Sequence, residues 1–210
     1  IYSYQNKTTK RLTHLQDAFV SKMKKGYHKG FQSVSSDGTV VSSILHLPDS
    51  NAKNLPLILF IHGGPVAQDD YSFDMTSRIY AEAGYAVATV NYRGSSGRGV
   101  AYTNAIYADW GNKEVKDIIG AADYLIKEGI ADPNRLGIAG WSYGGILSNY
   151  TIAKDKRFKA AVSGAGSSLM MSVYGSDQYV KQYEEEIGKP WENPRKWEAL
   201  SYPFYKVKEI

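Results

Sequence analysis

The sequence predicts an α/β fold, in which a mostly parallel β-sheet carries helices on both faces. Four short apolar segments indicate this, because they have the length and continuity of strands buried inside a parallel sheet. Segments with the apolar spacing of helices lie between them, and strands that alternate with helices specify such a sheet. The four predicted buried strands are 57–61, 86–90, 136–139 and 158–162.

The chain before residue 50 has a different character and is rich in Ser, Thr, Lys and Gly. Its alternating stretch 39–45 indicates an exposed strand, and the Ser-Asp-Gly turn at 36–38 indicates a hairpin with a preceding strand. We therefore expect a short β segment ahead of the α/β part.

The most regular predicted helix covers 113–128. Asn112 stands where it can cap the first turn, and Gly129 can end the helix. Segments 74–83 and 144–154 are expected to be helices in the same positions relative to the strands. The apolar stripe of 113–128 consists of Val115, Ile118, Ile119, Ala122, Leu125 and Ile126.

Composition excludes several classes of protein. The 210 residues include 25 basic and 21 acidic ones, and this length suits one domain, or one domain with part of another. The absence of Cys excludes disulfide and thiolate chemistry. The longest apolar run is far below the roughly 20 residues of a membrane helix, and the basic residues of the first 30 positions form no known nucleic-acid-binding motif. We predict neither a membrane nor a nucleic-acid partner.

In parallel sheets, the chemistry sits at the carboxyl ends of the strands. The first predicted buried strand is followed by 62–65, His-Gly-Gly-Pro, and the second by the glycine-rich loop 91–99. The third is followed by 140–145, Gly-Trp-Ser-Tyr-Gly-Gly. This last segment fits G-x-S-x-G, the pattern of a serine nucleophile on a tight turn between a strand and a helix.

Ser142 is therefore the predicted nucleophile. Gly140 and Gly144 lack the bulk that would obstruct so tight a turn. The oxyanion of an acyl-transfer reaction needs two hydrogen-bond donors, and the backbone N–H groups of Tyr143 and Gly64 are the candidates. The amino end of the following helix also favours developing negative charge.

Other kinds of site fit these glycines less well. A dinucleotide site would need an acidic residue about 20 positions on, and 160–164 contains none. A phosphate loop lacks its G-x-x-x-x-G-K-[ST] pattern, and no His cluster indicates a metal. His62 is expected to fix its own loop, because this strand–turn–helix arrangement places the catalytic His after the nucleophile. The sequence predicts no metal and no cofactor.

Several further residues receive structural interpretations. Arg93 and 109–111 are expected to brace loops around the site, and the three Glu of 184–186 to form a solvated helix face. Apolar residues after the fourth strand could line a pocket for the acyl part of a substrate or pack in the core. These are Leu169, Met170, Met171, Val173 and Tyr174, and the predicted substrate contacts are Tyr143, Leu169, Met171 and Tyr174.

With these motifs in place, the chain resembles the prolyl oligopeptidase family of serine peptidases, especially its acylaminoacyl-peptidase-like and dipeptidyl-peptidase-like branches. The resemblance covers about residues 28–210. It is carried by 62–65 (HGGP), 91–97 (NYRGSSG), 109–111 (DWG), 132–135 (DPNR), 140–145 (GWSYGG) and 188–194 (GKPWENP).

This resemblance implies an α/β-hydrolase domain over 28–210 that cleaves short peptides or acyl-peptides through an acyl-enzyme on Ser142. It also implies that 1–27 are the end of a preceding β-propeller-like domain and a linker, with 1–12 resembling the last propeller strand. The implied partners are a peptide substrate and that propeller domain, and a homo-oligomer is compatible with the family.

One part of the family pattern is missing. Family members carry the triad Asp after the next strand and the triad His later still, but all four His, at positions 14, 28, 46 and 62, precede Ser142. We therefore expect an incomplete copy of the domain, cut at both ends and inactive alone. A carboxylesterase and a non-catalytic binding protein on a hydrolase scaffold remain alternatives.

Overall fold

The structure, a computed structural model, describes residues 1–23 and 26–210. Its centre is a six-stranded sheet in the order β3-β4-β6-β5-β7-β8. β3 pairs antiparallel with β4, and β4 with β6, whereas β6, β5, β7 and β8 run parallel. The strands are β1 Tyr2–Gln5, β2 Thr8–Arg11, β3 Tyr27–Val34, β4 Val40–Leu47, β5 Leu55–Ile61, β6 Ala86–Val90, β7 Ala131–Trp141 and β8 Phe158–Gly164.

Helices connect the parallel strands, as the sequence pattern predicts. The three predicted helices, 74–83, 113–128 and 144–154, are confirmed as α2, α4 and α5. In the described part of the chain, the helices are α1 Asp17–Val20, α2 Met75–Glu82, α3 Val100–Thr103, α4 Lys113–Lys127, α5 Tyr143–Lys154, α6 Met170–Tyr174, α7 Val180–Glu186, α8 Pro194–Leu200 and α9 Tyr202–Tyr205, with short 3₁₀ turns at Asn104–Ile106 and Val207–Glu209.

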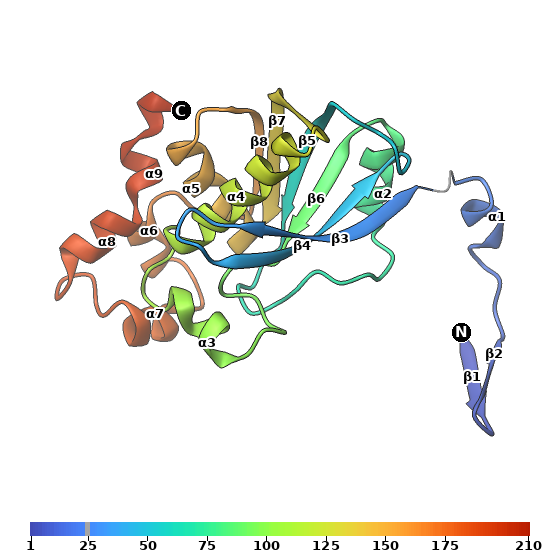
Figure 1. The fold of residues 1–210 in the computed structure, drawn as a ribbon. Coiled ribbons are helices and arrows are strands. Elements are labelled where there is room, and N and C mark those ends of the chain that lie inside the picture. Colours follow the sequence, from blue (N-terminus) through green and yellow to red (C-terminus); the bar gives the residue numbers. More distant parts are fainter. Residues whose placement is uncertain (24–25) are drawn as a thin grey trace.

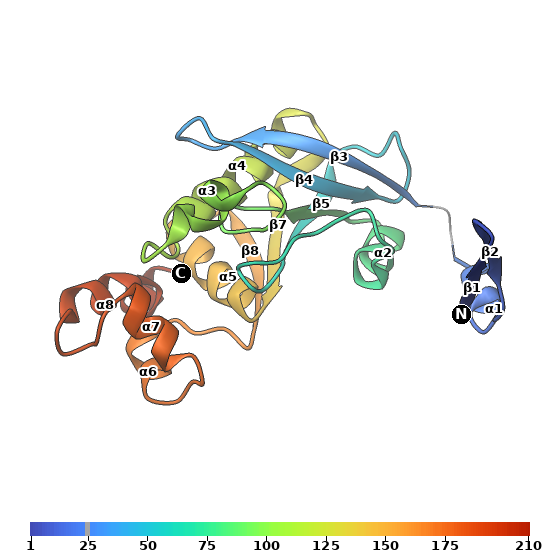
Figure 2. The ribbon, with the colours of Figure 1, turned by 90° about the horizontal axis from the view of Figure 1, so that it is seen from below.

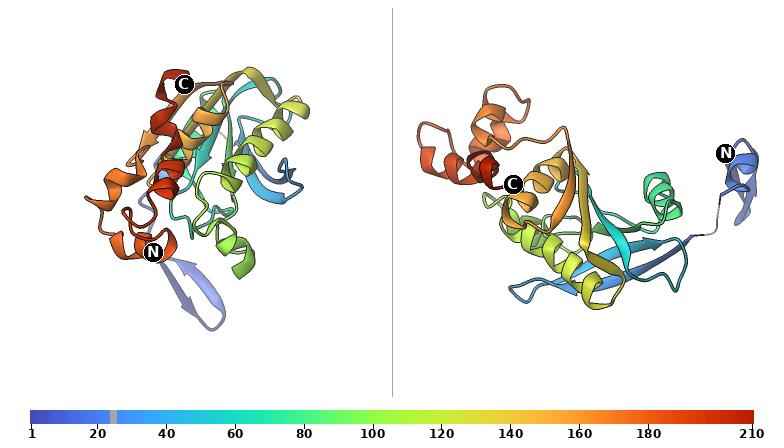
Figure 3. Two further views of the ribbon diagram at one scale, coloured as in Figure 1. Left: turned by 90° about the vertical axis from the view of Figure 1, so that its left-hand side faces the viewer. Right: turned by 90° about the horizontal axis from the view of Figure 1, so that it is seen from above.

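The sheet lies between two helical layers. Figures 1 and 3 show α4 and α5 on one face and α2 on the other, with α6, α7 and α8 gathered beyond α5. The main hydrophobic core fills the space under α4 and α5, where Leu59, Ala88 and Ile118 are fully buried. The predicted α/β fold is confirmed. None of the helices in the described residues combines the length and the apolar character needed to cross a membrane.

Helix α4 ends as its sequence predicts but begins differently. Gly129 adopts φ +68°, its N–H donates to Ile126, and the N–H of Ile130 donates to Leu125, which together close the last turn. The expected cap at the other end is wrong, because the side chain of Asn112 bonds the carboxylate of Asp109 and no helix amide.

The burial of several strands differs from expectation. The hairpin of β3 and β4 is confirmed. The expectation that 39–45 form an exposed strand is wrong, because β4 lies between β3 and β6 in the sheet and Val41 and Leu45 are fully buried. The predicted burial of β6 is confirmed over its whole length. In β5, Ile58 and Phe60 are only half-buried. The prediction that 158–162 are a buried strand is wrong: β8 is the last strand of the sheet and 159–163 are exposed, because no described element pairs with its outer edge.

The first 12 residues form a unit separate from the sheet. They contain two antiparallel strands, β1 and β2, where a single strand was expected. Asn6 and Lys7 make the turn between them with φ of +50° and +59°, a geometry typical of tight hairpins. Figures 1 and 2 place this hairpin away from the α/β body, beyond β3.

Candidate active site at the carboxyl ends of the parallel strands

Ser142 occupies the tight turn between β7 and α5. Its backbone has φ +57° and ψ −122°, a conformation that a residue with a β-carbon rarely adopts. The turn is held from both sides, because the N–H of Ser142 donates to Gly164 at 2.9 Å and its carbonyl accepts from Ile146 at 3.0 Å. The side chain of Ser142 is exposed, whereas the next residue, Tyr143, is buried.

The glycines around Ser142 allow the end of β5 and the loop after it to approach the turn closely. A β-carbon on Gly144 would collide with the carbonyl oxygen of Ile61, at the end of β5. A β-carbon on Gly63 would lie 2.9 Å from the carbonyl oxygen of Trp141 and 3.3 Å from Cβ of Ser142. The loop after β5 therefore lies directly beside the turn that carries the serine.

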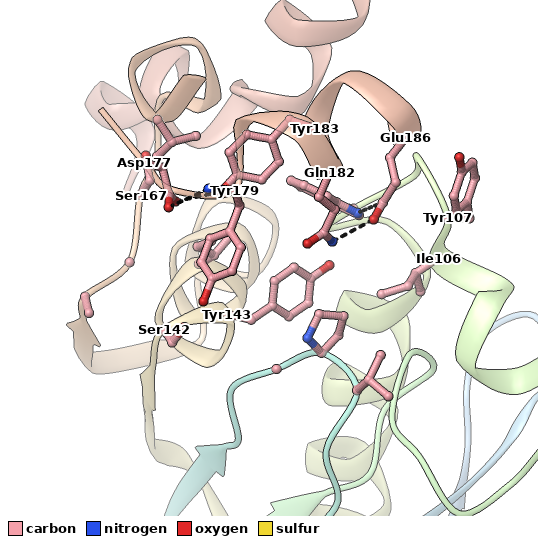
Figure 4. A pocket seen from close by; sticks show the side chains of 18 of the residues that line it. Ile106, Tyr107, Ser142, Tyr143, Ser167, Asp177, Tyr179, Gln182, Tyr183 and Glu186 are labelled. Atoms are coloured by element: carbon pink, nitrogen blue, oxygen red, sulfur yellow. Dashed lines mark hydrogen bonds between the residues drawn. The ribbon is translucent and has the colours of Figure 1, made fainter. Parts of the chain in front are cut away.

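A cavity of about 310 Å³ opens beside this turn. Figure 4 shows it between the Ser142 turn, the α7 segment and the chain around Ile106. The glycine loop, residues 62–65 after β5, contributes Gly64 to the lining, so Gly64, Ser142 and Tyr143 share one pocket. Its other walls include Pro65, Val66, Ile106, Tyr107, Trp110, Ile146, Val173, Asp177, Tyr179, Gln182, Tyr183 and Glu186.

Helix α7, which forms one wall of the cavity, is held by hydrogen bonds to the segment before α4. The indole N–H of Trp110 donates to Glu186 at 3.0 Å, and the hydroxyl of Tyr107 donates to the carbonyl of Glu185 at 2.8 Å. The ring of Trp110 packs edge-on against Tyr143 and Tyr183. The expectation that 184–186 only face solvent is therefore wrong for Glu186, which lines the cavity.

Three of the predicted substrate contacts lie elsewhere. Leu169 directly precedes α6, and Met171 is exposed on α6. The ring of Tyr174 packs against Trp197, and its hydroxyl donates to Glu184 at 2.6 Å. These three side chains do not line the cavity, to which this segment contributes Val173. The fourth predicted contact, Tyr143, does line it.

His62 is tied into its own loop. Its Nδ1 lies 2.7 Å from the carbonyl oxygen of Gly63, and its Nε2 accepts from the Ser95 hydroxyl at 2.9 Å. The ring stacks on that of Tyr92 at 4.4 Å, and burial lowers the pKa of the imidazole. One ring nitrogen thus binds the loop of His62 itself and the other binds the loop after β6, in agreement with the structural interpretation of this residue.

Arg93 braces the loop after β6, as expected. Its guanidinium bonds both carboxylate oxygens of the fully buried Asp117 and also contacts Asp37 at 2.9 Å. Burial alone would raise the pKa of Asp37, but hydrogen bonds from Thr39 and Arg93 lower it to about 2. The loop after β6 is thereby fixed to α4 and to the β3–β4 hairpin.

Sequence reasoning missed Glu114, which lies under the Ser142 turn with no exposed surface. It accepts a hydrogen bond from the Tyr143 hydroxyl at 2.6 Å. A signal was available, because a helical spacing of four places this charged residue on the same stripe as Ile118.

Among the described residues, no group of three or more His, Asp or Glu side chains is arranged to hold a metal ion.

Comparison with known proteins gives consistent matches. Residues 71–209 match the model of the prolyl oligopeptidase family. An uncharacterized peptidase of Bacillus subtilis, YuxL, is 37% identical over 79% of this chain and 26% of its own length. Dipeptidyl aminopeptidase BIII of Pseudoxanthomonas mexicana is 32% identical over 84% of this chain and 28% of its own length.

Solved structures agree with these sequence matches. An acylaminoacyl peptidase in complex with Z-Gly-Gly-Phe-chloromethyl ketone superposes with a TM-score of 0.88 and 30% identity, over 100% of this chain and 34% of that one. The uncomplexed acylaminoacyl peptidase of Pyrococcus horikoshii gives a TM-score of 0.85 at 28% identity, over 96% of this chain and 33% of that one. This chain spans about a quarter to a third of the length of these relatives.

Proposed function

Since the chain belongs to the prolyl oligopeptidase family, we propose that it is the nucleophile-bearing part of a serine peptidase that cleaves short peptides or acyl-peptides. The observation that carries this proposal is the strained turn of Ser142, which presents an exposed hydroxyl beside a cavity shared with Gly64 and Tyr143. The names of the relatives support it, because they include a dipeptidyl aminopeptidase and an acylaminoacyl peptidase.

In the proposed reaction, the oxygen of Ser142 attacks the carbonyl carbon of the scissile bond and loses its proton to a base. The N–H groups of Tyr143 and Gly64 bind the oxyanion that forms. Tyr143 is the first residue of α5, and the first amides of a helix have no acceptor within it. The base then gives this proton to the leaving amine as the intermediate collapses to the acyl-enzyme, and water hydrolyses the ester to release the acyl group from the serine.

The cavity is the proposed subsite for the acyl side of the substrate. Its volume of about 310 Å³ falls at the small end of ligand pockets, enough for one large side chain. The aromatic side chains of Trp110, Tyr143 and Tyr183 are part of its lining, which favours an apolar or aromatic group.

We propose that the base and its carboxylate partner come from parts of the protein outside these residues. The nearest His in sequence, His62, is occupied by Gly63 and Ser95. The exposed outer edge of β8 supports a further strand at this side of the sheet, because natural proteins rarely leave a strand edge uncovered.

We also propose that 28–210 belong to the α/β-hydrolase domain and 1–27 to the end of a β-propeller-like domain and a linker. The separation of the β1–β2 hairpin from the sheet supports this division (Figure 2). The propeller domain and a peptide substrate are the proposed partners of the site.

Labelling with a fluorophosphonate probe tests the proposal on the full-length protein. We expect the probe to modify Ser142, and Ser142→Ala to abolish both labelling and hydrolysis of acyl-peptides. Turnover of a p-nitrophenyl ester measured beside that of an acyl-peptide separates a peptidase from an esterase. Full activity of the Ser142→Ala variant would exclude the proposed mechanism.

A further inference from the structure

A buried carboxyl group supports the turn that carries Ser142. Glu114 lies in the first turn of α4, and its Oε1 accepts hydrogen bonds from the Tyr143 hydroxyl at 2.6 Å and from the N–H of Gly111 at 3.2 Å. Its Oε2 is buried and has no hydrogen-bond partner among the described residues. A single side chain on α4 therefore holds Tyr143, the residue on α5 that follows the proposed nucleophile.

This carboxyl group is costly to the fold. Burial of an incompletely satisfied carboxylate is unfavourable, and an apolar residue of similar volume is often more stabilising at such a position. Burial raises the pKa of Glu114 to about 7, although hydrogen bonds from Tyr143 and Gly111 oppose the increase. The Lys154 ammonium does not pair with Glu114 and donates instead to the carbonyl of Gly111. A purely structural role would therefore favour a different residue.

The partner of Glu114 is central to the candidate site. The Tyr143 ring is flanked by Trp110 at 6.1 Å and by Tyr92 at 6.3 Å between centroids. Tyr92 in turn supports the glycine loop through the carbonyl of His62. Both proposed oxyanion donors thus belong to segments that rest on one buried aromatic cluster, and Glu114 binds the member of that cluster next to Ser142.

We propose that Glu114 is a positioning residue whose hydrogen bond to the Tyr143 hydroxyl holds the Ser142–Tyr143 turn with the Tyr143 N–H directed at the oxyanion. The inference rests on the proposed function and deepens it. Glu114 touches no substrate, and its influence reaches the reaction through Tyr143 alone. Because the oxyanion forms only in the transition state, loss of this bond should lower kcat and leave KM nearly unchanged.

The test uses the full-length protein and three variants, Glu114→Ala, Tyr143→Phe and Glu114→Gln. We expect the first two to lower kcat for a peptide substrate about tenfold and to weaken a peptidyl boronic acid inhibitor about tenfold, with KM within about twofold. Glu114→Gln keeps an oxygen that can accept from Tyr143, so it should retain kcat within about twofold. Tyr143→Phe removes one hydroxyl oxygen and tests the proposal even if Glu114→Ala does not fold.

Tyr150→Phe is the matched control. This tyrosine lies on the same helix, is equally buried and donates its hydroxyl to the carbonyl of Leu200 instead of Glu114. It should leave kcat and boronate affinity unchanged. Unaltered kcat in Tyr143→Phe, or an equal loss in Tyr150→Phe, overturns the positioning role. An active Ser142→Ala variant would instead refute the proposed function itself.

Discussion

Tyr92 holds His62 by two contacts at once. The two rings stack at 4.4 Å with 18° between their planes, and the Tyr92 hydroxyl donates to the carbonyl oxygen of His62 at 2.8 Å. Because Gly63 and Gly64 follow His62 directly, this fully buried tyrosine sets the position of the glycine loop relative to the Ser142 turn. Burial also raises the pKa of the Tyr92 hydroxyl, so it remains a donor over the whole physiological range.

Tyr92→Phe tests this arrangement. The ring stack is kept and one hydrogen bond to a buried carbonyl is lost, which costs about 1 kcal/mol, or a factor of about five. We expect kcat/KM for a peptide substrate to fall by about that factor. Tyr85→Phe, on an exposed tyrosine, should have no effect. Equal kinetics for the two variants would contradict a role of Tyr92 in the loop.

Gly144→Ala should disturb the packing of α5 against β5. The added β-carbon meets the carbonyl oxygen of Ile61, which belongs to the backbone of a central strand and cannot rotate away. Overpacking of this kind costs about 1–3 kcal/mol, measurable as a lower midpoint in urea. Gly175→Ala is the control, because its β-carbon would lie 3.9 Å from the nearest atom and its φ is −86°. An unchanged urea midpoint for Gly144→Ala would contradict this prediction and mean that β5 shifts to make room for the added methyl group.

Asp117→Ala should strongly destabilise the protein. Among the described residues, it leaves the guanidinium of Arg93 with Asp37 as its one charged partner, and it removes the acceptor of the Arg93 N–H. Breaking a buried ion pair costs about 3–5 kcal/mol. Asp123→Ala breaks an exposed pair with Arg157 and should cost less than about 1 kcal/mol. Comparable unfolding free energies for the two variants would mean that Arg93 is well satisfied without Asp117.

Glu114→Gln should change how stability depends on pH. Burial raises the pKa of Glu114 from 4.5 to about 7, so the native state favours the neutral carboxyl. The stability that Glu114 contributes to the fold is fully present below pH 4.5 and is lost as the pH rises through about 7. Relative to Glu114→Gln, the unaltered protein should lose about 3 kcal/mol of unfolding free energy across that interval. Urea unfolding of both proteins at several pH values measures this difference, and parallel curves would contradict it.

Local signals were sufficient for much of the fold. The glycine after α4 predicted the end of that helix, and continuous apolar residues predicted the fully buried β6. The exposure of β8 could not be predicted, because an apolar segment does not reveal whether its outer edge is covered. Its composition resembles that of a central strand, although 159–163 are exposed.

The candidate site was predictable where its geometry is local. The pattern around Ser142 predicted a tight turn between a strand and a helix, and the structure has that turn. The lining of the cavity was predicted poorly, because packing against Trp197 directs Tyr174 away from it. The bond between Glu114 and Tyr143 joins residues 29 positions apart on different helices, so no local pattern contains it.

Tyr143 constrains how the specificity of this site can evolve. Its ring lines the cavity and its hydroxyl donates to Glu114, and in the proposed mechanism its backbone N–H also binds the oxyanion. A substitution at 143 that reshapes the cavity would also alter the reaction rate. Substrate specificity and rate therefore cannot be changed separately at this position. Tyr179 and Gln182 also line the cavity, and neither has a role in the proposed reaction. Adaptation to new substrates should therefore accumulate around α7, while position 143 stays fixed.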